Sequence, residues 1–152
     1  MNITGITNHM KFDKIFSEAR VNGKISWLVI SMMDGLPQAF IDQYFKMLKP
    51  FCIERTQKMN DWLIEKHADS LNWFMLLKHQ DVSEDVLKKN IRRLDKLQLW
   101  SLLLKTQKLS LEFMVDNIDR IKRSRNPIDA LDMNTSIEES VKAKVKSLIS
   151  AE

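Results

Sequence analysis

The chain has 152 residues, a single cysteine and a formal net charge of +4 at pH 7. This length is typical of one domain that buries a sizeable core, and the lone Cys52 excludes an intrachain disulfide framework and favours a reducing compartment. No stretch reaches the roughly 18 apolar residues of a membrane span, and the polar residues 1–11 contain no signal-peptide core. We therefore expect a cytoplasmic protein with no membrane partner.

The composition favours helices. Only three glycines and three prolines interrupt a sequence rich in Leu, Lys, Ile and Met, which leaves little room for hairpin turns. We expect residues 1–35 to form an N-terminal cap that contains one degenerate repeat. Its helices should run from Phe12 to Ala19 and from Ile25 to Met33, with Gly23 and Gly35 as helix-ending residues.

A short unit recurs over residues 36–122. Successive copies are 23, 23 and 27 residues apart and start at Leu36, Met59, Val82 and Leu109. A glutamine closes each full copy, at Gln57, Gln80 and Gln107. A fixed period of this size is typical of a repeat array, and we expect the three amides to bond backbone groups in the turns between copies.

Each copy carries two helical signals. The first follows a capping column of Pro37, Asn60, Ser83 and Ser110. The second begins near Trp73 and Trp100, with Asn72 and Asp95 as caps. Helices of two to three turns are too short to be stable alone, so neighbouring copies must cover each other's apolar faces. The expected core comprises Leu63, Trp73, Leu76, Trp100, Leu103 and Phe113.

One copy resembles a helical repeat found in proteins of bacteriophages and giant viruses. The matching residues are Leu63-Ile64-Glu65-Lys66-His67, Leu71-Asn72-Trp73, Leu76, Gln80 and Val82-Ser83. The first copy departs from the pattern, because Pro50 replaces the Trp and Glu54 occupies an apolar position. The resemblance covers roughly residues 25–121 and implies a structural motif without catalytic residues. It also implies a viral origin, and then a host-cell cytoplasmic location.

The repeat pattern stops after residue 122. We expect a connection over residues 123–135 and an amphipathic C-terminal helix over residues 136–152, opened by a capping box from Ser136 to Glu139. Val141, Val145, Leu148 and Ile149 form its apolar stripe. This helix either packs on the last repeat as a cap or docks in the groove of a partner.

Basic residues concentrate in the third copy. Residues 86–108 contain seven basic residues and one acidic residue, Asp95. Five of them, here called the basic strip, follow one another at helical spacing: Lys88, Lys89, Arg92, Arg93 and Lys96. The strip is either a solvated face that suits the negative end of its helix or a surface for an anionic partner. An acidic protein fits better than nucleic acid, because the strip has little aromatic interleaving.

No pattern in the sequence indicates catalysis, a metal or a cofactor. His67 and His79 lie twelve residues apart without a ligand-spaced partner, and a packing role suits His67 better than metal binding. The sequence therefore predicts a single all-α domain over residues 1–152, with short antiparallel helix pairs in tandem repeats of about 23 residues. We expect a small solenoid-like bundle with terminal capping helices. We interpret it as a protein-binding module, a viral factor that inhibits or redirects a host protein. The alternative is a nucleic-acid-binding accessory protein.

Overall fold

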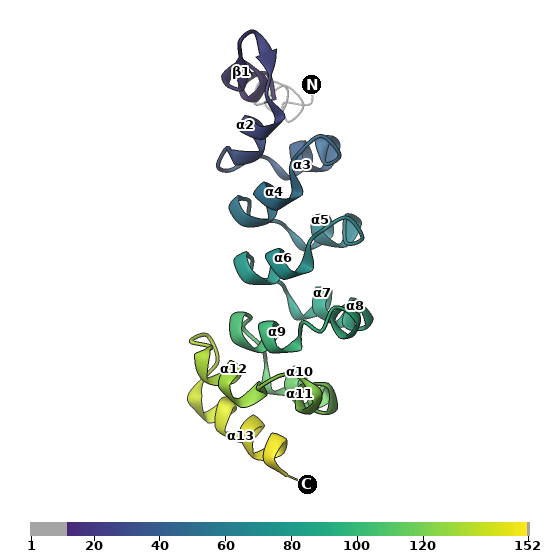
Figure 1. Cartoon of the computed structure of the whole chain (residues 1–152), viewed down its shortest axis with the longest axis vertical. Coiled ribbons are helices and arrows are strands. Elements are labelled where there is room, and N and C mark those ends of the chain that lie inside the picture. The colour runs from purple at the N-terminus through teal and green to yellow at the C-terminus, as the bar shows by residue number, and fades with distance from the viewer. Residues whose placement is uncertain (1–11, 152) are drawn as a thin grey trace, which may run out of the picture. The chain divides into compact units, whose positions relative to one another are not determined.

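The computed structural model describes residues 12–151, so the prediction for residues 1–11 lies outside it. The described chain is mostly helical, as predicted, and includes one two-stranded antiparallel sheet (Figure 1). It divides into two compact units, Met1–Asn72 and Trp73–Glu152, and each is described by itself.

The first unit is built from short helices and one hairpin. Its elements are a helix over residues 12–18, β1 (Arg20–Val21), β2 (Lys24–Ile25), α2 (Trp27–Met32), α3 (Gln38–Tyr44), α4 (Pro50–Thr56) and α5 (Asp61–Lys66). The N-terminal helix packs aromatic rings against α3, with Phe12 and Phe16 4.9 and 5.5 Å from the Phe40 ring. In the same unit, α2 packs against α4.

The hairpin corrects the prediction for this region. Strands β1 and β2 pair Arg20 with Ile25 around Asn22 and Gly23, whose φ angles are 51° and 76°. Two successive positive φ angles match the right-handed twist of a hairpin, and the Asn-Gly dipeptide favours them. Gly23 is therefore a turn residue and not a helix end. Helix α2 starts later than predicted, where the Ser26 hydroxyl accepts a hydrogen bond from the Val29 N–H at 3.3 Å.

Pro50 does not disturb the first copy. It lies in the first turn of α4, where proline is tolerated because its missing N–H has no partner to lose. The departure at Glu54 is more consequential, because this carboxyl is fully buried. Its Oε1 accepts a hydrogen bond from the backbone N–H of Asn72, and burial raises the pKa of Glu54 above its ordinary value despite that bond.

The second unit is entirely helical over residues 73–151. Its helices are α6 (Trp73–His79), α7 (Glu84–Lys89), α8 (Ile91–Lys96), α9 (Trp100–Thr106), α10 (Leu111–Asp116), α11 (Ile118–Arg123), α12 (Pro127–Met133) and α13 (Glu139–Ser150). Helix α9 packs against α6 and also against α12 and α11 (Figure 1). It is therefore the central helix of this unit.

Two asparagines divide what the sequence suggested were single helices. Asn90 separates α7 from α8 and Asn117 separates α10 from α11, each with φ of −113°. Their amides donate to the carbonyls of Val86 and Phe113, both at 2.8 Å. A side chain that bonds its own backbone in this way competes with regular helix, so each asparagine ends one helix and begins the next.

Both serines of the predicted capping column cap their helices. The Ser83 and Ser110 hydroxyls accept hydrogen bonds from Val86 N–H at 3.3 Å and Phe113 N–H at 3.1 Å, at the starts of α7 and α10. Asn60 is the N-cap of α5 without a side-chain bond.

The predicted connection over residues 123–135 is wrong, because most of it is helix α12. Asn126 has φ of 49°, and Pro127 then occupies the first helical turn. The Asn-Pro pair therefore marks the start of a new helix, since proline is favoured in the first helical turn. Ala130 and Leu131 of α12 are buried.

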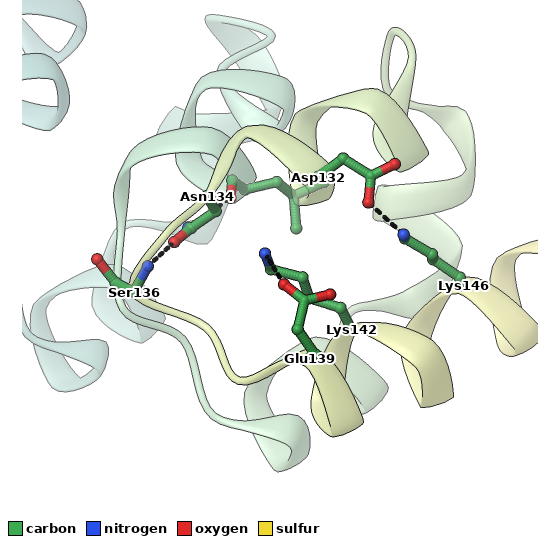
Figure 2. Close-up of polar contacts among 7 residues, drawn as sticks. Asp132, Asn134, Ser136, Glu139, Lys142 and Lys146 are labelled. Atoms are coloured by element: carbon green, nitrogen blue, oxygen red, sulfur yellow. Dashed lines mark hydrogen bonds and ion pairs between the residues drawn. The ribbon is translucent and has the colours of Figure 1, made fainter.

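The last helix packs as a cap on the second unit. Helix α13 contacts α10, α11 and α12. Lys142 bonds Glu139 at 2.7 Å and Lys146 pairs with Asp132 (Figure 2). The alternative of a detached helix is therefore wrong, and so is the capping box. Helix α13 begins at Glu139, and the backbone N–H of Ser136 donates instead to Asn134 at 2.8 Å.

Two members of the glutamine column, Gln57 and Gln107, bond backbone groups as predicted. In the first unit, Gln57 accepts from the Leu36 N–H at 2.9 Å and donates to the Met33 carbonyl. In the second unit, Gln107 accepts from the Val82 N–H at 2.8 Å and donates to two carbonyls, those of Leu77 at 2.7 Å and Gln80 at 2.9 Å.

The sequence did not predict that Asn134 continues this role. Its amide donates to the carbonyls of Leu104 and Gln107 at 2.7 and 2.8 Å. The side chain joins the end of α12 to the end of α9 by hydrogen bonds. The predicted core is also confirmed, because each of its six members is buried: Leu63, Trp73, Leu76, Trp100, Leu103 and Phe113.

Candidate functional site

The basic strip lies on two helices of the second unit. Lys88 and Lys89 end α7, and Arg92 and Lys96 lie on α8; all four are exposed. Arg93 is different, because it is half-buried and its guanidinium lies over the Trp73 ring, 5.5 Å from the ring centroid. This cation–π contact makes Arg93 part of the packing. Its predicted exposure is therefore wrong.

A hollow of about 490 Å³ lies along the strip. It is lined by Lys88, Lys89, Asn90, Ile91, Arg92 and Arg93, together with Arg120 from α11. Lys96 does not line it. We call this space the strip hollow. The packing of α11 thus adds a basic residue that follows the strip by more than twenty positions in the sequence.

Arg120 also lines a second hollow of about 720 Å³, here called the α11 hollow. Its other lining residues are Asp95, Gln98, Trp100, Ser101, Arg123, Ser124 and Arg125. Since one arginine borders both spaces, the basic surface continues from the strip hollow into the α11 hollow. Three arginines face one carboxylate in the second hollow.

Asp95 holds one wall of the α11 hollow in place. Its Oδ1 accepts a hydrogen bond from the Trp100 indole at 2.7 Å, and its Oδ2 accepts one from Arg120 Nε at 3.1 Å. Burial alone would raise the pKa of Asp95, but these two bonds and the charges of Arg120 and Arg123 outweigh it and lower the pKa. The carboxylate is therefore ionised at neutral pH. Its predicted role as a helix cap is wrong, because the N-cap of α9 is Leu99.

The other two arginines are Arg123 at the end of α11 and Arg125 in the turn after it. Arg123 donates from Nε to the Asp119 carbonyl at 3.0 Å, and the Ser124 hydroxyl donates to the Ile121 carbonyl at 2.7 Å. Arg123 and Arg125 are exposed. The basic run over residues 122–125 is local in the sequence, but its position beside the strip depends on how α8, α9 and α11 pack.

The described residues include no group of three or more His, Cys, Asp or Glu side chains placed to hold a metal ion. In the first unit, His67 bonds Asp42 at 2.8 Å and stacks on the Phe45 ring at a centroid distance of 3.8 Å. Hydrogen bonds from Lys66 and His67 lower the pKa of Asp42. His67 therefore has the predicted packing role.

Large apolar side chains are exposed on the first unit. Leu28 and Met32 of α2 and Phe51 of α4 are each more than half exposed, and the two helices pack against each other. Exposed apolar groups on neighbouring helices are typical of surfaces that bind other proteins when they form a patch of several hundred Å².

No known protein family, curated protein or solved structure matches this chain. Within residues 12–151, none of the helices has the length and apolar character needed to cross a membrane.

Proposed function

We propose that this chain is a non-catalytic binding protein of stacked helical repeats, and that its basic strip holds an acidic surface of another protein. The repeat architecture is supported by Gln57 and Gln107, which make corresponding hydrogen bonds in separate units. The resemblance to viral helical repeats adds the proposal that the partner is a host protein, which the chain inhibits or redirects by covering it.

One observation carries the choice of surface. The strip hollow and the α11 hollow share Arg120, so basic residues from three helices and the turn after α11 face the same region of the second unit. Positive charge gathered on one surface steers an anionic partner and raises the rate of association.

A protein partner is favoured over nucleic acid by the surroundings of this charge. Trp100 is the only aromatic residue that lines either hollow among the described residues, and it is 4% exposed. It therefore offers no open ring face on which a base could stack. An exposed acidic residue also interrupts the surface, since Asp119 directly precedes Arg120 on α11 and lies one helical turn before Arg123. A short acidic protein segment suits such a limited surface better than a long polyanion.

The test is a capture experiment at two salt concentrations. The full chain is immobilised and exposed to a host lysate, and bound proteins are compared between the wild type and Lys88→Glu plus Arg92→Glu. The matched control is Lys78→Glu plus Lys144→Glu, which reverses two exposed lysines that line neither hollow. We expect the strip variant to lose a partner that the control retains.

Gel-shift titrations with random duplex and single-stranded nucleic acids run in parallel at about 50 and 200 mM salt, the range over which phosphate contacts are lost. Sub-micromolar nucleic-acid binding at the higher salt, abolished by the strip variant and kept by the control, would contradict the proposal.

A further inference from the structure

We infer that the α11 hollow binds a phosphoryl group carried by a side chain of the partner protein. The inference rests on the proposed protein-binding function and narrows it to a phosphorylated segment. It assigns the strip hollow a supporting role, in which its lysines and arginines attract the acidic residues around the phosphorylated side chain.

The charge of the hollow fits this ligand. Arg120, Arg123 and Arg125 line it together with one carboxylate, Asp95, which leaves an excess of positive charge. A phosphorylated side chain carries about −1.5 to −2 charges near pH 7 and three strong acceptor oxygens. Several guanidinium forks can engage these oxygens at once, whereas a carboxylate brings one charge and two oxygens.

Two of the three arginines are held before any ligand arrives. Arg120 donates through Nε to Asp95, and Asp95 is itself fixed by the Trp100 indole. Arg123 donates through Nε to the Asp119 carbonyl. Since both bonds use Nε, they leave the terminal amino groups of each guanidinium able to donate to an anion. Such preorganisation lowers the conformational entropy lost on binding.

The size of the hollow favours a group presented by a peptide. A space of about 720 Å³ is much larger than a free phosphate and accommodates a phosphorylated side chain with part of its backbone. Ser101 on α9 also lines the space, and a serine hydroxyl can add a neutral hydrogen bond. A single-stranded nucleic acid would additionally need stacking partners, and Trp100 is buried.

The experiment is calorimetric titration of the full chain with three pentapeptides, Ala-Ala-X-Ala-Ala, where X is phosphoserine, glutamate or serine. We expect the phosphoserine peptide to bind at least about tenfold more tightly than the glutamate peptide, because charge-assisted bonds to a dianion are the stronger ones. Arg123→Gln plus Arg125→Gln should reduce that affinity by about tenfold or more. Both residues are exposed, so the fold should persist, and circular dichroism verifies this.

A second measurement keeps the test independent of affinity alone. The Trp100 indole N–H, which bonds Asp95 in the wall of the hollow, should shift in a ¹⁵N–¹H spectrum on addition of the phosphoserine peptide. Lys78→Glu plus Lys144→Glu serves as the control and should retain this shift, because both lysines are exposed and neither lines either hollow.

Equal affinity for the glutamate peptide would overturn the phosphoryl assignment. Tighter binding of an oligothymidine than of the phosphoserine peptide, abolished by the same arginine variant, would also overturn it. Failure of this inference is distinguishable from failure of the proposed function. If lysate capture survives the arginine variant and no phosphoserine binding is measured, only this inference fails. If phosphoserine binds but the strip variant loses no protein partner, the proposed function fails.

Discussion

The turn around Gln57 in the first unit and the turn around Gln107 in the second share a pattern of hydrogen bonds but differ in a buried side chain. In each, a buried carboxamide accepts from a backbone N–H and donates to carbonyl oxygens at the end of an earlier helix. Three residues before the glutamine the two turns differ, since the first unit has Glu54 and the second has Leu104. Both of these side chains are fully buried.

This difference distinguishes the structural roles of two positions in the repeated turn. The glutamine satisfies backbone groups that would otherwise be buried without partners, and neither turn substitutes another residue type for it. The position three residues earlier only fills space, so a carboxyl is tolerated there once a backbone N–H, that of Asn72, donates to it. The cost is a carboxyl whose burial raises its pKa, which Leu104 avoids.

The largest expected effect comes from truncating the core side chain that occupies the same repeat position in each turn. Leu103 in the second unit and Ile53 in the first occupy the same repeat column, and both are fully buried. We expect Leu103→Ala and Ile53→Ala each to reduce the free energy of unfolding by about 2–5 kcal/mol, since each leaves a cavity. Urea denaturation followed by circular dichroism measures this.

Leu97→Ala is the control for these two variants, because Leu97 is about half exposed. It should change the free energy of unfolding by less than about 0.5 kcal/mol. A Leu103→Ala variant as stable as this control would show that the column does not define a core.

Removing the glutamine amide should have the next largest effect. Gln107→Ala leaves the Val82 N–H and the carbonyls of Leu77 and Gln80 without the amide, and an unsatisfied buried group costs about 1–3 kcal/mol. Gln57→Ala should cost a similar amount. Hydrogen exchange of the Val82 amide in the Gln107→Ala variant provides a local measurement, and its protection should fall.

Gln43→Ala is the control for the amide, because this glutamine is exposed and bonds only the neighbouring Tyr44 hydroxyl among the described residues. An unchanged stability of Gln107→Ala would mean that water replaces the amide in the turn, and the two turns would then depend on apolar packing alone.

The same distinction explains what the sequence could predict. The glutamine turns and the buried columns follow from a periodic pattern, and Asn134 lies 27 residues after Gln107, the spacing between Gln80 and Gln107. That signal existed but was hidden by the change of residue type. The hairpin at Asn22 and Gly23 also had a known turn signature.

Other features depend on tertiary packing. From the sequence alone, Asn90 could cap a helix, form a turn or lie within a helix. In the structure, its side chain bonds the Val86 carbonyl and ends α7. The basic strip is local in sequence and was found, whereas its continuation through Arg120 and Arg123 requires α11 to pack beside α8 and α9. Arg93 left the predicted strip because the Trp73 ring lies beneath it.

A smaller effect should appear in the pH dependence of stability. Because the pKa of Glu54 is raised in the folded state, the folded chain binds this proton more tightly than the unfolded chain. Its contribution to stability is present below the ordinary Glu pKa of about 4.3 and is lost as the pH rises through the folded-state value. Glu54→Gln keeps an acceptor for the Asn72 N–H but cannot titrate.

We therefore expect Glu54→Gln to gain stability relative to the wild type as the pH rises from acid to neutral, measured by thermal unfolding at several pH values. Asp42 and Asp95 have lowered pKa values, so their contributions are lost as the pH falls, but they are common to both proteins and cancel in the comparison. A difference that is constant with pH would show that Glu54 is not the titrating group that distinguishes the turns.

The smallest expected effect concerns a second pair of corresponding residues at the surface. Gln38 in the first unit accepts from the Asn60 N–H at 2.8 Å, and Glu84 in the second accepts from the backbone N–H and hydroxyl of Ser110. One acceptor is a neutral amide and the other a carboxyl. These bonds are exposed to water, so the charge should matter little.

We expect Glu84→Gln to change the free energy of unfolding by less than about 0.5 kcal/mol and Glu84→Ala to reduce it by about 1 kcal/mol, as for loss of one ordinary hydrogen bond. Both are measured by urea denaturation. If Glu84→Gln were as damaging as Glu84→Ala, the second unit would require a carboxyl where the first unit uses an amide, and the correspondence between the units would be limited to their buried glutamines.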